Sequence, residues 1–221
     1  KAASFYSKKQ DPFYQLSKYW LAESYFRNDK FQDAGATFTD LYNISALDGQ
    51  TEGKLIPYDL AYCYFKEGDY PSAIKWFDNY LAGDSPEYAQ DAALRKADCY
   101  FINKNYSGAI TAYSKAIDTY NIKDDLYPYY RLGVAYGLQG NNAKKLEALS
   151  IAKNSSANTP FYSETMYELG RAYVNAGDND DATRCFKTLK GAAKDSTFVA
   201  KALIELGMIS RNESNYDQAL E

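Results

Sequence analysis

The strongest constraint on this chain is an internal repeat. A pattern of leucine, a small residue, two variable residues and tyrosine recurs in six segments, beginning at Leu21, Leu60, Lys96, Leu132, Leu169 and Leu206, and only Lys96 and Ser210 depart from it. Twelve residues after each small residue, as from Ala22 to Ala34, comes a second position that is alanine in five of the six repeats. The period varies from 36 to 39 residues, whereas the twelve-residue offset is constant. The chain is therefore predicted to be a repeat array whose insertions fall between repeats.

Each repeat predicts two helices joined by a tight turn. Apolar and small residues recur three to four positions apart on both sides of the turn, which places them on one helical face. Gly, Asn and Asp residues, which end and cap helices, are frequent in these turns, at 28–30, 67–69, 103–105, 139–141, 176–178 and 213–215. We expect Pro71 at the start of a second helix. The other prolines are expected in loops between repeats or in first turns, where a missing N–H is harmless: Pro12, Pro57, Pro86, Pro128 and Pro160.

The composition narrows the classes of function. The chain has 221 residues and no histidine, which removes the usual general base near neutral pH and the commonest metal ligand. Its net charge is −4, so it lacks the positive field of a non-specific nucleic-acid binder. No apolar run reaches the roughly 18 residues of a membrane-spanning helix. We therefore expect no nucleic-acid partner and no membrane insertion by this segment.

The repeat resembles a known family. Its pattern is similar to W-x-x-L-G-x-x-Y followed by A-x-x-x-F, the motif of the tetratricopeptide repeat. The resemblance covers residues 15–221 and implies an all-α, right-handed α-solenoid of about six helix pairs, with repeats starting near residues 15, 54, 90, 126, 163 and 200. Residues 1–14 are then expected to end a preceding repeat, and the chain to be a fragment of a longer protein. Lys145, Leu149 and Ser210 depart from the motif and are expected to weaken the packing of their repeats.

Three stretches extend the resemblance to the bacterial cell-envelope branch of the family. Residues 19–26, 85–94 and 201–207 are similar to repeats of the Tol-Pal cell-division coordinator and of the outer-membrane assembly lipoprotein. This similarity favours a periplasmic or outer-membrane-associated location over the cytoplasm. The three cysteines weigh against it, because unpaired thiols are uncommon in an oxidising compartment. Cys63 and Cys99, at equivalent positions in consecutive repeats, are expected to be buried and unpaired.

In tetratricopeptide arrays the first helices line a concave groove, and the resemblance places large and charged residues there. The candidate partner-binding residues are Tyr19, Glu23, Arg27, Tyr58, Tyr62, Lys66, Asp98, Phe101, Tyr130, Tyr167 and Arg171. Tyrosine combines contact area with a hydrogen-bonding tip at low entropy cost, which suits peptide binding. The alternative is that most of these rings pack helix against helix. Arg27 and Lys66, at equivalent positions, either bind a carboxylate of the partner or are solvated charges.

These features predict a protein-interaction scaffold, not an enzyme, that binds a peptide or helix of a partner protein in its groove. The expected setting is a bacterial cell-envelope or assembly complex. We expect no cofactor and no metal ion, and the oligomeric state is open. Three alternatives remain: a non-catalytic region of a larger enzyme or signalling protein, a glycan-binding protein, and a spacer whose groove binds nothing. The short insertions between repeats argue against the glycan-binding alternative, because the starch-utilisation receptors built on such repeats carry long ones.

Overall fold

The structure, a computed structural model, describes residues 11–45, 47–192 and 196–213, and over these ranges it is helical and has no strand. The elements follow the chain as α1 (Pro12–Arg27), α2 (Phe31–Asn43), α3 (Thr51–Glu67), α4 (Tyr70–Ala82), α5 (Ala89–Ile102), α6 (Tyr106–Tyr120), α7 (Leu126–Leu138), α8 (Asn142–Leu149), the 3₁₀-helix η2 (Ser150–Asn154), α9 (Tyr162–Ala176), α10 (Asn179–Ala192) and α11 (Ser196–Asn212). Five helix pairs and the first helix of a sixth repeat are thus described. The predicted second helix of that repeat, with Ala219, lies outside the described residues.

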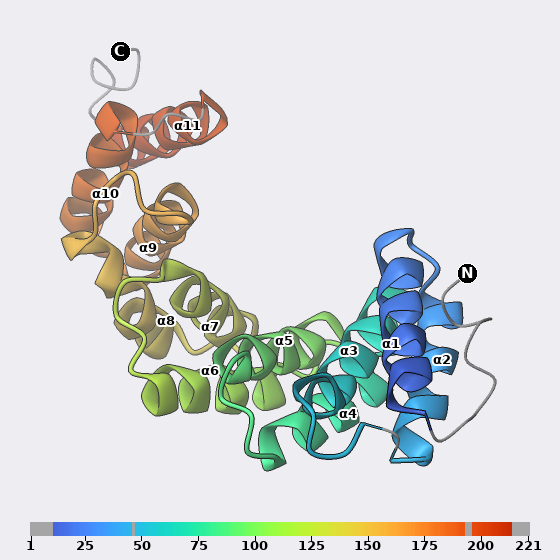
Figure 1. Cartoon of the computed structure of the whole chain (residues 1–221). Coiled ribbons are helices and arrows are strands. Elements are labelled where there is room, and N and C mark those ends of the chain that lie inside the picture. The colour runs from blue at the N-terminus through green and yellow to red at the C-terminus, as the bar shows by residue number, and fades with distance from the viewer. Residues whose placement is uncertain (1–10, 46, 193–195, 214–221) are drawn as a thin grey trace. The chain divides into compact units, whose positions relative to one another are not determined.

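The chain divides into two compact units, residues 1–112 and 113–221, whose boundary falls inside α6. In unit 1, α1 to α4 each pack on the next helix along the chain, α4 packs on α5, and α1 also contacts α3. In unit 2, α7 to α11 follow the same order, with further contacts of α9 with α7 and α11. Within each unit, consecutive helices lie side by side (Figure 1). The first helices of successive repeats are therefore neighbours within a unit, as α1 and α3 are in unit 1 and α9 and α11 are in unit 2.

The turns inside the repeats share one hydrogen-bond pattern. The central residue of each described turn has a positive φ, at Asp29, Gly68, Lys104, Gly140 and Gly177. The N–H of the next residue donates to the carbonyl of the repeat tyrosine, as Asp69 does to Tyr64 at 3.0 Å and Asn141 to Tyr136 at 2.9 Å. The side chains of Asp69, Asn105, Asn141 and Asp178 then accept from the N–H three residues on, which caps the second helix. The predicted turns are confirmed, except that residues 214–215 are not described.

Small residues allow the two helices of a repeat to approach closely. Ala22 and Ala34 are both fully buried in the first repeat, as are their equivalents Ala61 and Ala73 in the second. The glycines of unit 2 show how little room there is: a Cβ added to Gly170 would lie 2.6 Å from the Phe186 ring. The large residues of the motif, including Phe38 and Phe77, are fully buried around these contacts.

The fourth repeat replaces the alanine of its second helix with Lys145, yet this residue is only 8% exposed. Its stem lies against α7, where a Cβ on Gly137 would be 3.0 Å from Lys145 Cδ. Its Nζ is 2.5 Å from a carboxylate oxygen of Glu168 on α9. The first three repeats have Phe26, Phe65 and Phe101 at the position of Gly137. In the fourth repeat the second helix, through Lys145, therefore fills space that a phenylalanine of the first helix fills in the first three repeats. That Lys145 weakens the packing of its repeat stays a prediction.

The proline prediction is wrong at Pro57, which lies inside α3 and is buried. The error has a simple cause. The extra residues between the first two repeats extend α3, which begins at Thr51 rather than near residue 54. Pro57 cannot donate to the carbonyl of Gly53, four residues earlier, so that one backbone hydrogen bond of the helix is not formed.

The cysteine prediction is confirmed. Cys63 and Cys99 are free thiols and are at most 1% exposed, and Cys185 is also free and buried. Burial raises the pKa of Cys63 and of Cys99 to about 12. Both side chains are therefore neutral at physiological pH and act as small apolar residues.

We expect Gly137→Phe and Lys145→Ala each to destabilise the chain by about 1 to 3 kcal/mol, the first by overfilling the contact and the second by leaving a cavity and an unpaired Glu168. The double variant should be less destabilised than the sum of the single changes, because it recreates the arrangement of the first three repeats. Urea unfolding followed by circular dichroism measures this. Additive effects would contradict the exchange of volume between the helices.

Candidate functional site

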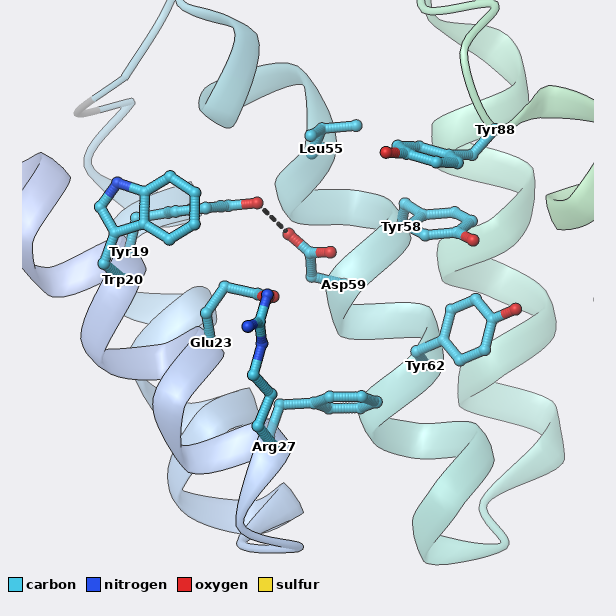
Figure 2. A pocket seen from close by; sticks show the side chains of 10 residues that line it. Tyr19, Trp20, Glu23, Arg27, Leu55, Tyr58, Asp59, Tyr62 and Tyr88 are labelled. Atoms are coloured by element: carbon cyan, nitrogen blue, oxygen red, sulfur yellow. Dashed lines mark hydrogen bonds and ion pairs between the residues drawn. The ribbon is translucent and has the colours of Figure 1, made fainter.

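A cavity of about 480 Å³ lies between α1 and α3 in unit 1. Its lining residues are Tyr19, Trp20, Glu23, Phe26 and Arg27 of α1, Leu55, Tyr58, Asp59 and Tyr62 of α3, and Tyr88 in the segment before α5. Figure 2 shows side chains from both helices reaching into the space between them. We call this site the α1–α3 pocket. Five of the predicted groove residues meet here: Tyr19, Glu23, Arg27, Tyr58 and Tyr62.

Hydrogen bonds from tyrosine to carboxylate hold the walls of the pocket. The hydroxyl of Tyr19 donates to Asp59 Oδ2 at 2.9 Å and so links α1 to α3. The hydroxyls of Tyr58 and Tyr62 both donate to Asp91 Oδ2 on α5, at 2.9 and 2.5 Å. Each of these bonds connects the first helices of two successive repeats, so the rings of the pocket are fixed by the packing of the array.

The rings also contact one another. Tyr58 stacks on Tyr88 with centroids 5.0 Å apart and meets Tyr62 edge to face at 4.9 Å. The backbone N–H of Tyr88 donates to the hydroxyl oxygen of the buried Tyr80 at 3.1 Å, which positions the segment before α5. Stacked and edge-to-face pairs are the favourable geometries of aromatic rings. The aromatic wall is thus preorganised.

Two carboxyl groups of the pocket, those of Glu23 and Asp59, have raised pKa values. Burial raises the pKa of Asp59 well above its usual range; the negative charge of Glu23 adds to this, and the hydrogen bond from Tyr19 opposes it. Burial also raises the pKa of Glu23, which the positive charge of Arg27 opposes. Arg27 stands at the rim, with a side chain 75% exposed and its guanidinium 3.7 Å from Glu23. The lining of the pocket thus has two carboxyl groups, and its one basic side chain, that of Arg27, lies at the rim.

The other predicted residues of unit 1 lie outside the pocket lining. Lys66 is exposed in the last turn of α3. Asp98 is 1% exposed and forms an ion pair with Arg95, so its carboxylate does not face a partner. Phe101 is half-buried and packs edge to face on Tyr106 at 5.6 Å. The observed contacts of Asp98 and Phe101 are thus with other residues of the array, and neither side chain lines the pocket.

The predicted residues of unit 2 have contacts of their own. Tyr130 stacks on Phe161, with centroids 5.9 Å apart. Tyr167 donates through its hydroxyl to Glu205 Oε1 at 3.0 Å, and Arg171 is 3.7 Å from the same oxygen. Arg171 also lines a second hollow of about 570 Å³ with Val134, Leu138, Asn175 and the Lys145–Glu168 ion pair. No aromatic side chain lines this hollow.

The set of predicted site residues omits five residues that line the pocket: Trp20, Phe26, Leu55, Asp59 and Tyr88. Asp59 stands two residues before the small residue of its repeat, a position that is charged in five of the six repeats. That recurrence is a signal which sequence reasoning could have used. Tyr88 carries no such signal, because its place depends on the hydrogen bond to Tyr80.

Across the described ranges, no group of three or more His, Cys, Asp or Glu side chains is arranged to hold a metal ion. In the same part of the chain, none of the helices combines the length and the apolar character needed to cross a bilayer.

Comparison with protein families supports the repeat assignment. Two segments, residues 58–124 and 165–200, match models of the tetratricopeptide repeat. The chain therefore contains tetratricopeptide repeats. The helix pair with Gly137 and Lys145 lies between the two matched segments. Among curated proteins, none matches the chain.

Solved structures of MamA share the fold. One is 18% identical and covers 91% of this chain and 94% of its own, with a TM-score of 0.65. MamA from Desulfovibrio magneticus RS-1 is 20% identical over 80% of this chain and 94% of its own, also at 0.65. A third MamA structure is 20% identical and covers 73% and 88%, at 0.62. At this identity the likeness establishes the fold alone, and it confirms the predicted α-solenoid of helix pairs.

We expect Asp59→Asn to stabilise the chain at neutral pH. Because the pKa of Asp59 is raised in the fold, the stability that this group contributes is fully present below its unfolded pKa of about 3.9 and is lost as the pH rises through the folded pKa. Asparagine removes the buried charge and can still accept from Tyr19. Thermal unfolding at pH 7 should show a higher Tm, by roughly 2 to 4 °C for each kcal/mol gained.

The gain in Tm should shrink as the pH falls toward the unfolded pKa of about 3.9, because the raised pKa of Asp59 favours the neutral form of the carboxyl group. Glu147→Gln, at an exposed carboxyl of α8, serves as the control and should change Tm little at either pH. An equal or larger gain at low pH would show that the charge of Asp59 is not the cause.

Proposed function

We propose that these tetratricopeptide repeats serve as a protein-interaction scaffold, and that the α1–α3 pocket holds part of a peptide or helix of a partner protein. The observation that carries the proposal is the pocket itself, a preorganised aromatic cavity between the first helices of two repeats. Its volume of about 480 Å³ lies within the range of roughly 300 to 1,000 Å³ that is typical of ligand sites.

The rim of the pocket favours a partner larger than a small molecule. Trp20 is 52% exposed and Tyr88 is 38% exposed, so both present apolar area beyond the cavity. Aromatic residues of this kind are enriched in protein interfaces, where they supply contact area at low entropy cost. A peptide with one side chain in the pocket would cover both rings with its neighbouring residues.

The setting is part of the proposal. We infer a bacterial cell-envelope or assembly complex, supported by the similarity of residues 19–26, 85–94 and 201–207 to envelope proteins of the family. Fractionation of the source cells, with detection by an antibody against this chain, tests it. Recovery with periplasmic or outer-membrane material is the expected result, and recovery in the cytoplasm alone would contradict it.

Trp20→Ala should weaken peptide binding by about tenfold or more, because truncation of a tryptophan that acts as an interface hot spot costs about 2 kcal/mol or more. Short random peptides displayed on phage are selected on the immobilised chain. The affinity of the enriched peptides for each variant is then measured by fluorescence polarisation.

Phe13→Ala is the matched control. Phe13 is an aromatic residue of the same helix, is 68% exposed, and does not line the pocket. The pocket would be refuted as a partner site if the enriched peptides bound Trp20→Ala and the unchanged chain with equal affinity. It would also be refuted if the selection enriched no peptide.

A further inference from the structure

We propose that the α1–α3 pocket recognises its partner by a cationic side chain, lysine or arginine, that enters between Glu23 and Asp59. This inference rests on the proposed function and adds the chemistry of the partner. It assigns the pocket a preference for positive charge.

The two carboxylates reach the pocket from different helices. Glu23 lies on α1 and Asp59 on α3, and Figure 2 shows Asp59 extending from α3 toward α1. The hydroxyl of Tyr19 donates to Asp59 Oδ2 and uses one of the roughly four acceptor sites of that carboxylate. An ammonium or guanidinium group brings several N–H donors for the remaining sites, and hydrogen bonds between charged groups are stronger than neutral ones.

The aromatic lining suits the same occupant. The face of an aromatic ring attracts a cation within about 6 Å of its centroid, most strongly for tryptophan. Trp20 and Phe26 supply such rings from α1, and Tyr62 supplies one from α3. The bond from Tyr62 to Asp91 holds its ring in place before a partner arrives. Carboxylates among preorganised rings are the elements from which proteins build cation sites.

Other occupants fit the charges less well. An apolar side chain would exclude water from Glu23 and Asp59 without replacing its hydrogen bonds, which is costly for a buried charge. A carboxylate of the partner would add a third negative charge, opposed only by Arg27 at the rim. The Arg27–Glu23 pair is weak, because the side chain of Arg27 is 75% exposed. An entering cation can therefore replace this contact at little cost.

The raised pKa values of the two carboxyl groups are consistent with a site for a cation. In the chain alone, burial disfavours the charged forms of Glu23 and Asp59 and raises the pKa of both. A cation between them favours the charged forms.

The test uses the whole chain and a defined set of peptides. Short peptide mixtures are made in which one position is fixed in turn as lysine, arginine, glutamate, norleucine or citrulline. Norleucine and citrulline keep approximately the shape of lysine and arginine without the charge. At one position, lysine or arginine should bind the chain about tenfold more tightly than its neutral counterpart, as a charged hydrogen bond with a cation–π contact predicts.

Matched variants locate the effect in the pocket. Glu23→Gln with Asp59→Asn should abolish the preference for lysine or arginine over the neutral peptides. Glu147→Gln with Asp180→Asn removes two exposed charges from unit 2 and should leave the preference unchanged. Both double variants change the net charge of the chain equally, so a general electrostatic effect would appear in both.

The outcomes separate the two proposals. Equal binding of charged and neutral peptides, or stronger binding of glutamate, overturns the cation preference while the scaffold proposal stands. A preference for lysine or arginine that survives Glu23→Gln with Asp59→Asn also overturns it. If no mixture binds the chain above the level of Trp20→Ala, both the cation preference and the scaffold proposal fail.

Discussion

Contact between two small residues, twelve positions apart, is the constraint on which the rest of the structure depends. Where Ala22 and Ala34 let the helices of a repeat approach, the large residues around them fill the space that remains. The intervening turn then has a fixed length and a fixed hydrogen-bond pattern, closed through the carbonyl of the repeat tyrosine. The number of residues varies only in the segments that join one repeat to the next, as in the extension of α3.

Successive repeats are joined differently, by tyrosine hydroxyls that donate to carboxylates of the next first helix. Tyr19 with Asp59 and Tyr58 with Asp91 are examples in unit 1, and Tyr167 with Glu205 repeats the arrangement in unit 2. These bonds put acidic groups among aromatic rings. At Asp59 the acidic group borders a cavity, and the raised pKa of its carboxyl is a cost to the fold.

The helix pairs and turns could be predicted from the sequence because they follow from local rules. Glycine, asparagine and aspartate grouped between two periodic segments end one helix and cap the next, so the turn at Gly68 could be placed without a structure. The candidate site could be predicted only in part. Periodicity gives the face of a helix on which Tyr62 lies, but it does not show that Asp98 is buried against Arg95. It also does not bring Tyr88 to the pocket, because that contact depends on a hydrogen bond to Tyr80, which periodicity does not reveal.

The exchange of volume between Gly137 and Lys145 has a consequence for how such an array can change over time. A substitution at only one of the two positions leaves the contact between the helices either overfilled or with a cavity. The two positions can therefore change only together, or through an ancestor of lower stability. The exchange lies inside one helix pair, and its one ion pair with a neighbouring repeat joins Lys145 to Glu168. An array of this kind can therefore lose its recognisable motif one repeat at a time while its architecture persists.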